Sequence, residues 1–108
     1  MTPRRGEVWW VSLDPAQGSE IRKTRPCVVM GTNVLNDRRR TVVIVPLSSA
    51  PQAAPPLLVP VVCVGRRAVA VIDQIRAVTK ERFTRRLGEL SPEELAAVEE
   101  GLRLVLEL

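Results

Sequence analysis

Five short runs of apolar, largely β-branched residues, each bounded by proline, glycine or charged residues, constrain the fold of this chain more than any other feature. The runs cover residues 7–13, 26–30, 41–45, 58–64 and 68–72. Runs of this length and composition are typical of β-strands, and residues 73–78 continue the alternation as a bent or further strand. We therefore predict a mainly β fold with α, in which about five strands form a small curled antiparallel barrel.

One helix is predicted in the last part of the chain. Ser91 is its expected N-cap, Pro92 suits the first turn, and Glu94 completes a capping box with Ser91. Apolar side chains recur at helical spacing at Leu95, Val98, Leu102 and Val105. Gly101 costs roughly 1 kcal/mol relative to alanine inside a helix, so we expect close packing there. This C-terminal helix closes off a single domain spanning residues 1–108.

The connections are marked by turn-forming residues. Gly65-Arg66-Arg67 is a hairpin signal between the fourth and fifth runs. Residues 33–40 read as a short turn or one helical turn that ends in three arginines, and residues 49–56, rich in proline and alanine, indicate a long connection. Because proline has no N–H for a strand ladder, Pro26 is expected at the start of its strand and Pro46 at the end of the third.

The charge is unevenly distributed along the chain. The formal net charge is +4, but residues 1–88 carry 15 basic and 6 acidic residues, a balance of +9. Residues 89–108 carry 1 basic and 6 acidic residues, a balance of −5. A basic body attracts polyanions such as nucleic acids, although basic surface also serves solubility alone.

The complete lack of histidine and tyrosine restricts the chemistry available. Histidine's acid–base and metal-ligand roles must fall to other groups, which argues against zinc enzymes and histidine-dependent nucleophilic enzymes. Cys27 and Cys63 lie in apolar runs and read as buried thiols of a reducing compartment. No apolar stretch has the length of a membrane span or the pattern of a secretory signal. We therefore expect a cytoplasmic protein with no membrane contact and no cofactor.

An ordered set of short motifs carries a family resemblance along nearly the whole chain. The motifs are Arg5-Gly6-Glu7-Val8-Trp9, Leu13-Asp14-Pro15, Gly18-Ser19-Glu20, Thr24-Arg25-Pro26, Val45-Pro46-Leu47-Ser48 and Asp73-Gln74-Ile75-Arg76. In this set the sequence resembles the MazF/PemK family of bacterial toxins. The resemblance implies an SH3-like barrel that forms a homodimer, and a metal-independent endoribonuclease that cuts single-stranded RNA at a short sequence. It also implies a partner antitoxin, whose acidic, initially disordered segment covers the active surface.

The resemblance also implies roles for individual residues. The catalytic arginine corresponds to Arg25, the catalytic hydroxyl to Ser48 or Ser49 with Ser48 favoured, and the acid of the Gly-Ser-Glu motif to Glu20. The expected RNA-binding residues are Ser19, Arg22, Lys23, Thr24, Ser49, Gln74 and Arg76. Residues 21–24 depart from the family, in which small residues, often glycine, precede the Arg-Pro pair. Serine also replaces the usual threonine after Pro46.

These residues suit the cleavage of RNA, which supplies its own nucleophile. Attack of the 2′-OH on the adjacent phosphorus gives a 2′,3′-cyclic phosphate and a 5′-OH fragment, and DNA lacks that hydroxyl. The planar guanidinium of Arg25 matches two phosphate oxygens. Pro26 favours an extended backbone at Arg25 and so gives it a defined direction. Ser48 can donate to a phosphate oxygen, while Glu20 and Arg25 are both candidates for proton transfer from the 2′-OH.

A simpler interpretation stands beside each assignment. Arg25 alone would read as a surface cation, Ser48 and Ser49 as strand-end caps, and Glu20 as an exposed ion-pair partner. Two other functions also stay open: a non-enzymatic toxin that poisons DNA gyrase on the same barrel, and a basic module that binds nucleic acid without cutting it. The gyrase poisons carry a Trp-Gly-Ile tail where this sequence reads Leu-Glu-Leu at 106–108.

The two tryptophans are expected in the core or at a subunit interface. With only 2 Trp, 1 Phe and no Tyr, base stacking cannot be the main means of holding a single strand. Trp9 and Trp10 alternate in the first predicted strand, so their side chains should point to opposite faces of the sheet.

Overall fold

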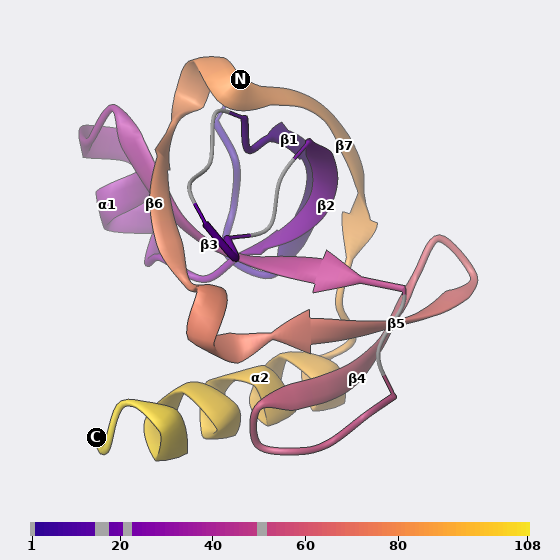
Figure 1. Ribbon diagram of the computed structural model, residues 1–108. Helices are drawn as coiled ribbons and strands as arrows, with labels where there is room; N and C mark the ends of the chain where they lie inside the picture. The colour runs from indigo at the N-terminus through magenta and orange to yellow at the C-terminus, as the bar shows by residue number, and fades with distance from the viewer. Residues whose placement is uncertain (1, 15–17, 21–22, 50–51) are drawn as a thin grey trace.

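The computed structural model describes residues 2–14, 18–20, 23–49 and 52–108. The elements run in the order β1 (Glu7–Ser12), β2 (Thr24–Val29), α1 (Asn33–Arg38), β3 (Thr41–Ser48), β4 (Leu58–Cys63), β5 (Arg66–Val71), η1 (Ile72–Gln74), β6 (Arg76–Thr79), η2 (Lys80–Arg82), β7 (Phe83–Glu89) and α2 (Pro92–Val105). Figure 1 shows β1, β2, β3, β6 and β7 curled into a barrel, with the β4–β5 hairpin and α2 below them. Within the described residues, neither helix has the length and apolar character needed to cross a bilayer.

The strands form one antiparallel sheet in the order β4-β5-β3-β2-β1-β7, and β6 pairs with β3 beside this path. The predicted class, a mainly β barrel closed by a C-terminal helix, is therefore confirmed. The predicted count of about five strands is wrong, because the described part of the chain forms seven. The main omission is β7, whose residues 83–89 are mostly exposed or half-buried because the strand lies at the sheet edge beside β1. Its sequence therefore lacks the apolar run of a central strand.

β3 connects the two halves of the sheet. Residues 41–44 pair with β6, residues 44–46 pair with β2, and residues 47 and 48 pair with β5. The expectation that Pro46 ends this strand is wrong, since β3 continues to Ser48. Pro46 lies opposite Cys27, at the last β2–β3 pair before β3 moves to β5, where a missing N–H is tolerated.

The β4–β5 hairpin turns at Val64 and Gly65, whose φ angles are +51° and +74°. Two consecutive positive φ angles are the mark of a type I′ hairpin turn, whose twist matches that of the flanking strands. The hairpin signal is thus confirmed, with the turn one residue earlier than the sequence indicated. As a result, Arg66 and Arg67 are the first residues of β5 rather than part of the turn.

The opposite faces of the central strands bury two separate apolar clusters. Trp9, Val11 and Leu13 of the first strand region point into one cluster with residues of β2, β3 and β6. Val8 points into the other, which lies among β2 to β5 and α2. Trp9 is thus a core residue, as expected, and its ring meets Phe83 edge to face with centroids 5.9 Å apart. This alternation leaves Trp10 half-buried on the other side.

α2 begins as the sequence predicts. The Ser91 side chain accepts a hydrogen bond from the Glu94 N–H at 3.1 Å, and the Glu94 carboxylate accepts one from the Ser91 N–H at 2.9 Å. The apolar stripe packs on the hairpin side of the core, with Val98 fully buried. A Cβ added to Gly101 would lie 2.8 Å from the Pro56 carbonyl oxygen. The close packing expected at Gly101 is therefore confirmed.

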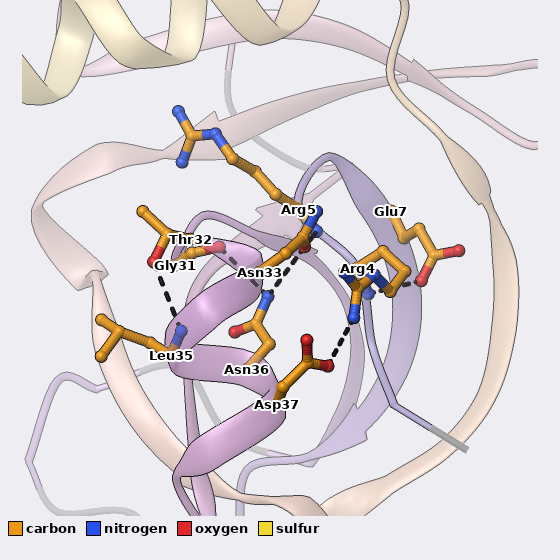
Figure 2. A network of polar contacts seen from close by, with 9 residues as sticks. All are labelled: Arg4, Arg5, Glu7, Gly31, Thr32, Asn33, Leu35, Asn36 and Asp37. Carbon is orange, nitrogen blue, oxygen red and sulfur yellow. Dashed lines mark hydrogen bonds and ion pairs between the residues drawn. The ribbon is translucent and has the colours of Figure 1, made fainter.

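The short helix α1, which the sequence offered as a turn or single helical turn, is tied to the N-terminal segment (Figure 2). The Arg5 N–H donates to Asn33 Oδ1 at 2.8 Å, and the Arg4 guanidinium pairs with Asp37 at 2.6 Å. Buried Asn36 donates from Nδ2 to the Gly31 carbonyl at 3.1 Å. The contacts of Arg4 and Arg5 hold the segment before β1 against α1.

Candidate active site

One cavity is lined by four of the predicted site residues, Thr24, Arg25, Ser48 and Ser49. It has a volume of about 360 Å³ and lies where β2 begins, β3 ends and the β4–β5 hairpin turns. Its lining residues are Trp10, Thr24, Arg25, Pro26, Leu47, Ser48, Ser49, Cys63, Arg66, Arg67 and Ala68. Arg25 and both candidate serines are thus neighbours in space although more than twenty residues separate them in the sequence.

The backbone before Arg25 is fixed by local hydrogen bonds. Lys23 adopts a left-handed conformation with φ +67°, its N–H donates to Asp14 Oδ1 at 2.9 Å, and its carbonyl accepts from the Leu13 N–H at 2.9 Å. β2 then starts at Thr24, and Arg25 pairs with Val11 of β1. The Arg25 side chain therefore projects from a residue of a paired, extended strand, as the following proline led us to expect.

Sheet register accounts for the proximity of Arg25 and Ser48. The last β2–β3 pair is Cys27 with Pro46, and continuing this antiparallel register outward by two residues sets Arg25 opposite Ser48. At that point β3 pairs instead with β5, where Ser48 lies opposite Val69. The cavity opens between the diverging ends of the two strands. Ser48 is half-buried and Ser49 is exposed, and both line the cavity, so the choice between them stays open.

The hairpin contributes residues that the sequence analysis did not place in the site. Arg66, Arg67 and Cys63 line the cavity from the ends of β4 and β5. The signal for the arginines was present, because two cations directly after a hairpin glycine must lie at a hairpin tip, but nothing local indicated which part of the barrel that tip approaches. Trp10 also lines the cavity, whereas we expected it in the core or at a subunit interface.

The remaining predicted residues lie elsewhere. Ser19, Glu20 and Lys23 are exposed and do not line this cavity, although Lys23 directly precedes β2. Gln74 lies in η1 and Arg76 in β6, and neither is a lining residue of this cavity. Arg22 falls outside the described residues. The structure therefore brings together Thr24, Arg25, Ser48 and Ser49 but not the full predicted set.

The electrostatic character of the cavity is cationic. Among its described lining residues, the side chains that are charged at neutral pH are Arg25, Arg66 and Arg67. Burial raises the pKa of the Cys63 thiol, so it stays neutral there. Outside the cavity, burial also raises the pKa of Cys27 to about 12, with the charge of Arg76 acting in the opposite direction. Three guanidinium groups, three hydroxyls and an indole ring suit an anion with attached planar groups.

The comparisons with known proteins agree with this geometry. Residues 4–106 match the family described as PemK-like, MazF-like toxin of type II toxin–antitoxin system. The chain belongs to this family. The curated Endoribonuclease MazF9 of Mycobacterium tuberculosis is 37% identical over 114 residues, which cover 97% of each protein. The expected family is confirmed, and the curated relative's name supports the predicted enzyme class.

Solved structures confirm the fold. MazF from Deinococcus radiodurans superposes with a TM-score of 0.90 at 24% identity, covering 100% of this chain and 99% of the other. An endoribonuclease from a mycobacterial species, solved in complex with its cognate antitoxin, gives a TM-score of 0.82 at 23% identity, with 98% and 96% of the two chains covered. The barrel, the hairpin and the terminal helix are thus the architecture of MazF toxins.

Proposed function

We propose that this chain is the toxin of a type II toxin–antitoxin system and that it cuts single-stranded RNA at a short sequence without a metal ion. The observation that supports this most is the convergence of Arg25, Ser48 and Ser49 on one cationic cavity. Membership of the MazF-like family and the endoribonuclease names of its curated relatives point to the same activity.

Cleavage proceeds by attack of the ribose 2′-oxygen on the neighbouring phosphorus. The new P–O2′ bond forms while the P–O5′ bond breaks, giving a 2′,3′-cyclic phosphate and a 5′-OH. One proton leaves the 2′-OH and one reaches the departing 5′-oxygen. The protein must hold the attacking oxygen in line and stabilise the charge that builds on the phosphoryl oxygens.

Arg25 binds the scissile phosphate. Its guanidinium stays charged and donates to two non-bridging oxygens in a fixed plane. Ser48 or Ser49 donates a further hydrogen bond to the same phosphate from the β3 end of the cavity. These contacts strengthen as negative charge grows in the transition state, which is the condition for lowering the barrier.

Proton transfer is assigned to Glu20 or Arg25. Glu20 lies outside the cavity lining, in the loop before β2. Arg25 is already inside the cavity and half-buried, which favours it as the group nearest the 2′-OH. Thr24 contacts RNA from the cavity wall, and Ser19, Arg22, Lys23, Gln74 and Arg76 extend the contact surface over its surroundings.

The proposed partners follow from charge and from the family. An antitoxin with an acidic, disordered C-terminal segment occupies the cationic cavity and so competes with RNA. The toxin acts as a homodimer, which covers exposed apolar residues such as Leu104, 55% exposed, and Leu108, 80% exposed. A cytoplasmic location places the enzyme where its RNA substrate is.

The test is incubation of a long, mixed-sequence RNA with the pure protein in EDTA, followed by mapping of the new ends. Discrete cuts are expected for the wild type and for Arg39→Ala, a matched control whose arginine lies at the end of α1. Arg25→Ala should leave the RNA intact while keeping the fold, and a DNA of the same sequence should survive. Intact RNA with folded wild-type protein would instead indicate binding without cleavage or a non-enzymatic toxin.

A further inference from the structure

A second cavity borders the candidate active site. It has a volume of about 510 Å³, within the range of about 300–1,000 Å³ that is usual for small-molecule sites. Its lining residues are Ser49, Gln52, Ala53, Pro60, Val61, Val62, Arg67, Ala68, Val69 and Glu94. It shares Ser49, Arg67 and Ala68 with the first cavity, so the two lie on either side of these three residues.

The walls of this second cavity are mainly apolar, with a few polar groups. Ala53, Pro60 and Val62 are exposed residues that give it flat apolar sides, and Gln52 offers an amide with both donors and an acceptor. The Glu94 carboxylate is already engaged, because it accepts hydrogen bonds from the Ser91 N–H at 2.9 Å and from the Val62 N–H at 2.6 Å. Glu94 therefore acts as a fixed part of the wall.

Arg67 stands at the boundary between the cavities. It is paired with Val62 across the β4–β5 hairpin, and cross-strand partners project to the same face of a sheet. Arg67 therefore rises beside the apolar wall of the second cavity while also lining the first. A cation between a phosphate site and an apolar cavity matches the order of groups along a nucleic acid strand, in which successive phosphates are separated by a ribose that carries a base.

We propose that the second cavity holds the base of a nucleotide that adjoins the pair flanking the cleaved bond, and that Arg67 binds the non-scissile phosphate joining this nucleotide to that pair. This inference rests on the proposed ribonuclease function. It makes the β4–β5 hairpin, rather than the loop before β2 alone, a determinant of sequence preference. Arg67 is a binding residue, so its loss weakens substrate binding more than the chemical step.

The first test compares Arg67→Ala with Arg103→Ala on a short RNA carrying one mapped cleavage site. Arg103 is an exposed cation on α2, in an i,i+3 ion pair with Glu100, and is the matched loss of charge. Arg67→Ala should raise KM about tenfold with kcat within about twofold, as expected for one lost phosphate contact. It should also reduce the slope of log KM against log salt by about 0.7, the value for one contact to a single strand.

The second test fills the cavity. Ala53→Trp places an indole in it from an exposed position, and Ala54→Trp, an exposed neighbour outside the lining, is the control. RNAs with an abasic nucleotide at each successive position identify the base held there. At one of the two positions adjoining the pair that flanks the cut, removal of the base should slow the wild type and add nothing to the defect of Ala53→Trp.

Three results would overturn the inference while the wild type still cleaves RNA. Unchanged KM and salt slope for Arg67→Ala would show that Arg67 does not bind a phosphate of the substrate. If the wild type were a dimer and Ala53→Trp a monomer, the cavity would be part of a subunit interface. Normal RNA cleavage by Ala53→Trp, with lost inhibition by an acidic peptide, would make it a peptide site. Failure of the wild type to cleave any RNA would instead refute the proposed function.

Discussion

Replacement of Gly101 by alanine tests how the hairpin that borders the site is held in place. A methyl group there would lie 2.8 Å from the Pro56 carbonyl oxygen, 3.1 Å from Ile72 Cγ1 and 3.2 Å from Val59 Cγ2. These neighbours lie before β4, in η1 and in β4 itself, so the new group pushes on the segment that carries the hairpin. Two opposing effects decide the outcome.

The magnitude follows from those two effects. Alanine improves helix propensity by roughly 1 kcal/mol over glycine. Overpacking of a close contact typically costs about 1–3 kcal/mol, and a backbone carbonyl cannot rotate away as a side chain can. Because the Pro56 carbonyl itself must shift, the cost lies in the upper part of this range, at about 2–3 kcal/mol, which leaves a net loss of about 1–2 kcal/mol in the free energy of unfolding. For a chain of this size this corresponds to a Tm lower by very roughly 4–16 °C.

The assay is urea unfolding at one fixed protein concentration, because dimer formation would make stability depend on concentration. Gly88→Ala is the control, since a Cβ at Gly88 meets no atom of the described residues within 4 Å. Gly88→Ala should change the unfolding midpoint little. If Gly101→Ala were as stable as the wild type or more stable, Pro56 and its neighbours would not be packed rigidly on α2.

Four further substitutions separate the roles of site and scaffold. Arg25→Lys keeps the charge but loses the planar guanidinium, so kcat should fall by a factor of about 10²–10³. The circular dichroism spectrum should stay unchanged. A near-normal kcat would show that a point charge is sufficient at this position. Ser48→Ala should lower kcat more than Ser49→Ala, and the reverse ranking would reassign the hydroxyl to Ser49. Glu7→Gln should lower stability by roughly 1–2 kcal/mol at pH 7. Partial burial raises the pKa of Glu7, but hydrogen bonds from Trp9, the Arg4 N–H and Arg86 outweigh burial and hold the pKa below its usual value. This contribution is present above the unfolded pKa of about 4.3 and is lost as pH falls through the folded pKa, so urea midpoints of wild type and variant should converge in acid; a constant difference would contradict the account.

The sequence predicted those parts of the fold that depend on local patterns. The capping box of α2, the alternation around Trp9 and the hairpin near Gly65 are each determined by residues within a few positions of one another. β7 was missed because an edge strand beside β1 needs only one partly covered face, so its sequence is mixed. The passage of β3 through Pro46 was missed because it depends on the change of partner from β2 to β5.

The candidate site was predictable only in part, for the same reason. Arg25 and Ser48 were assigned from family motifs, and sheet register then brings them together. The approach of Arg66 and Arg67 depends on how the hairpin folds back towards β2, a long-range relation without a local signal. Trp10 was expected in the core or at a subunit interface because half-burial beside a cavity and full burial give the same apolar pattern in a strand.

The most direct test of the central claim is a single 2′-deoxy substitution at the nucleotide whose 2′-oxygen is proposed to attack. The mapped RNA and its singly substituted form would be incubated with the protein in EDTA, and the masses of the products would be measured by mass spectrometry. The account predicts a 2′,3′-cyclic phosphate and a 5′-OH from the RNA, and no cleavage at that bond in the substituted strand. Cleavage of the deoxy-substituted bond, or a need for a divalent cation, would contradict it.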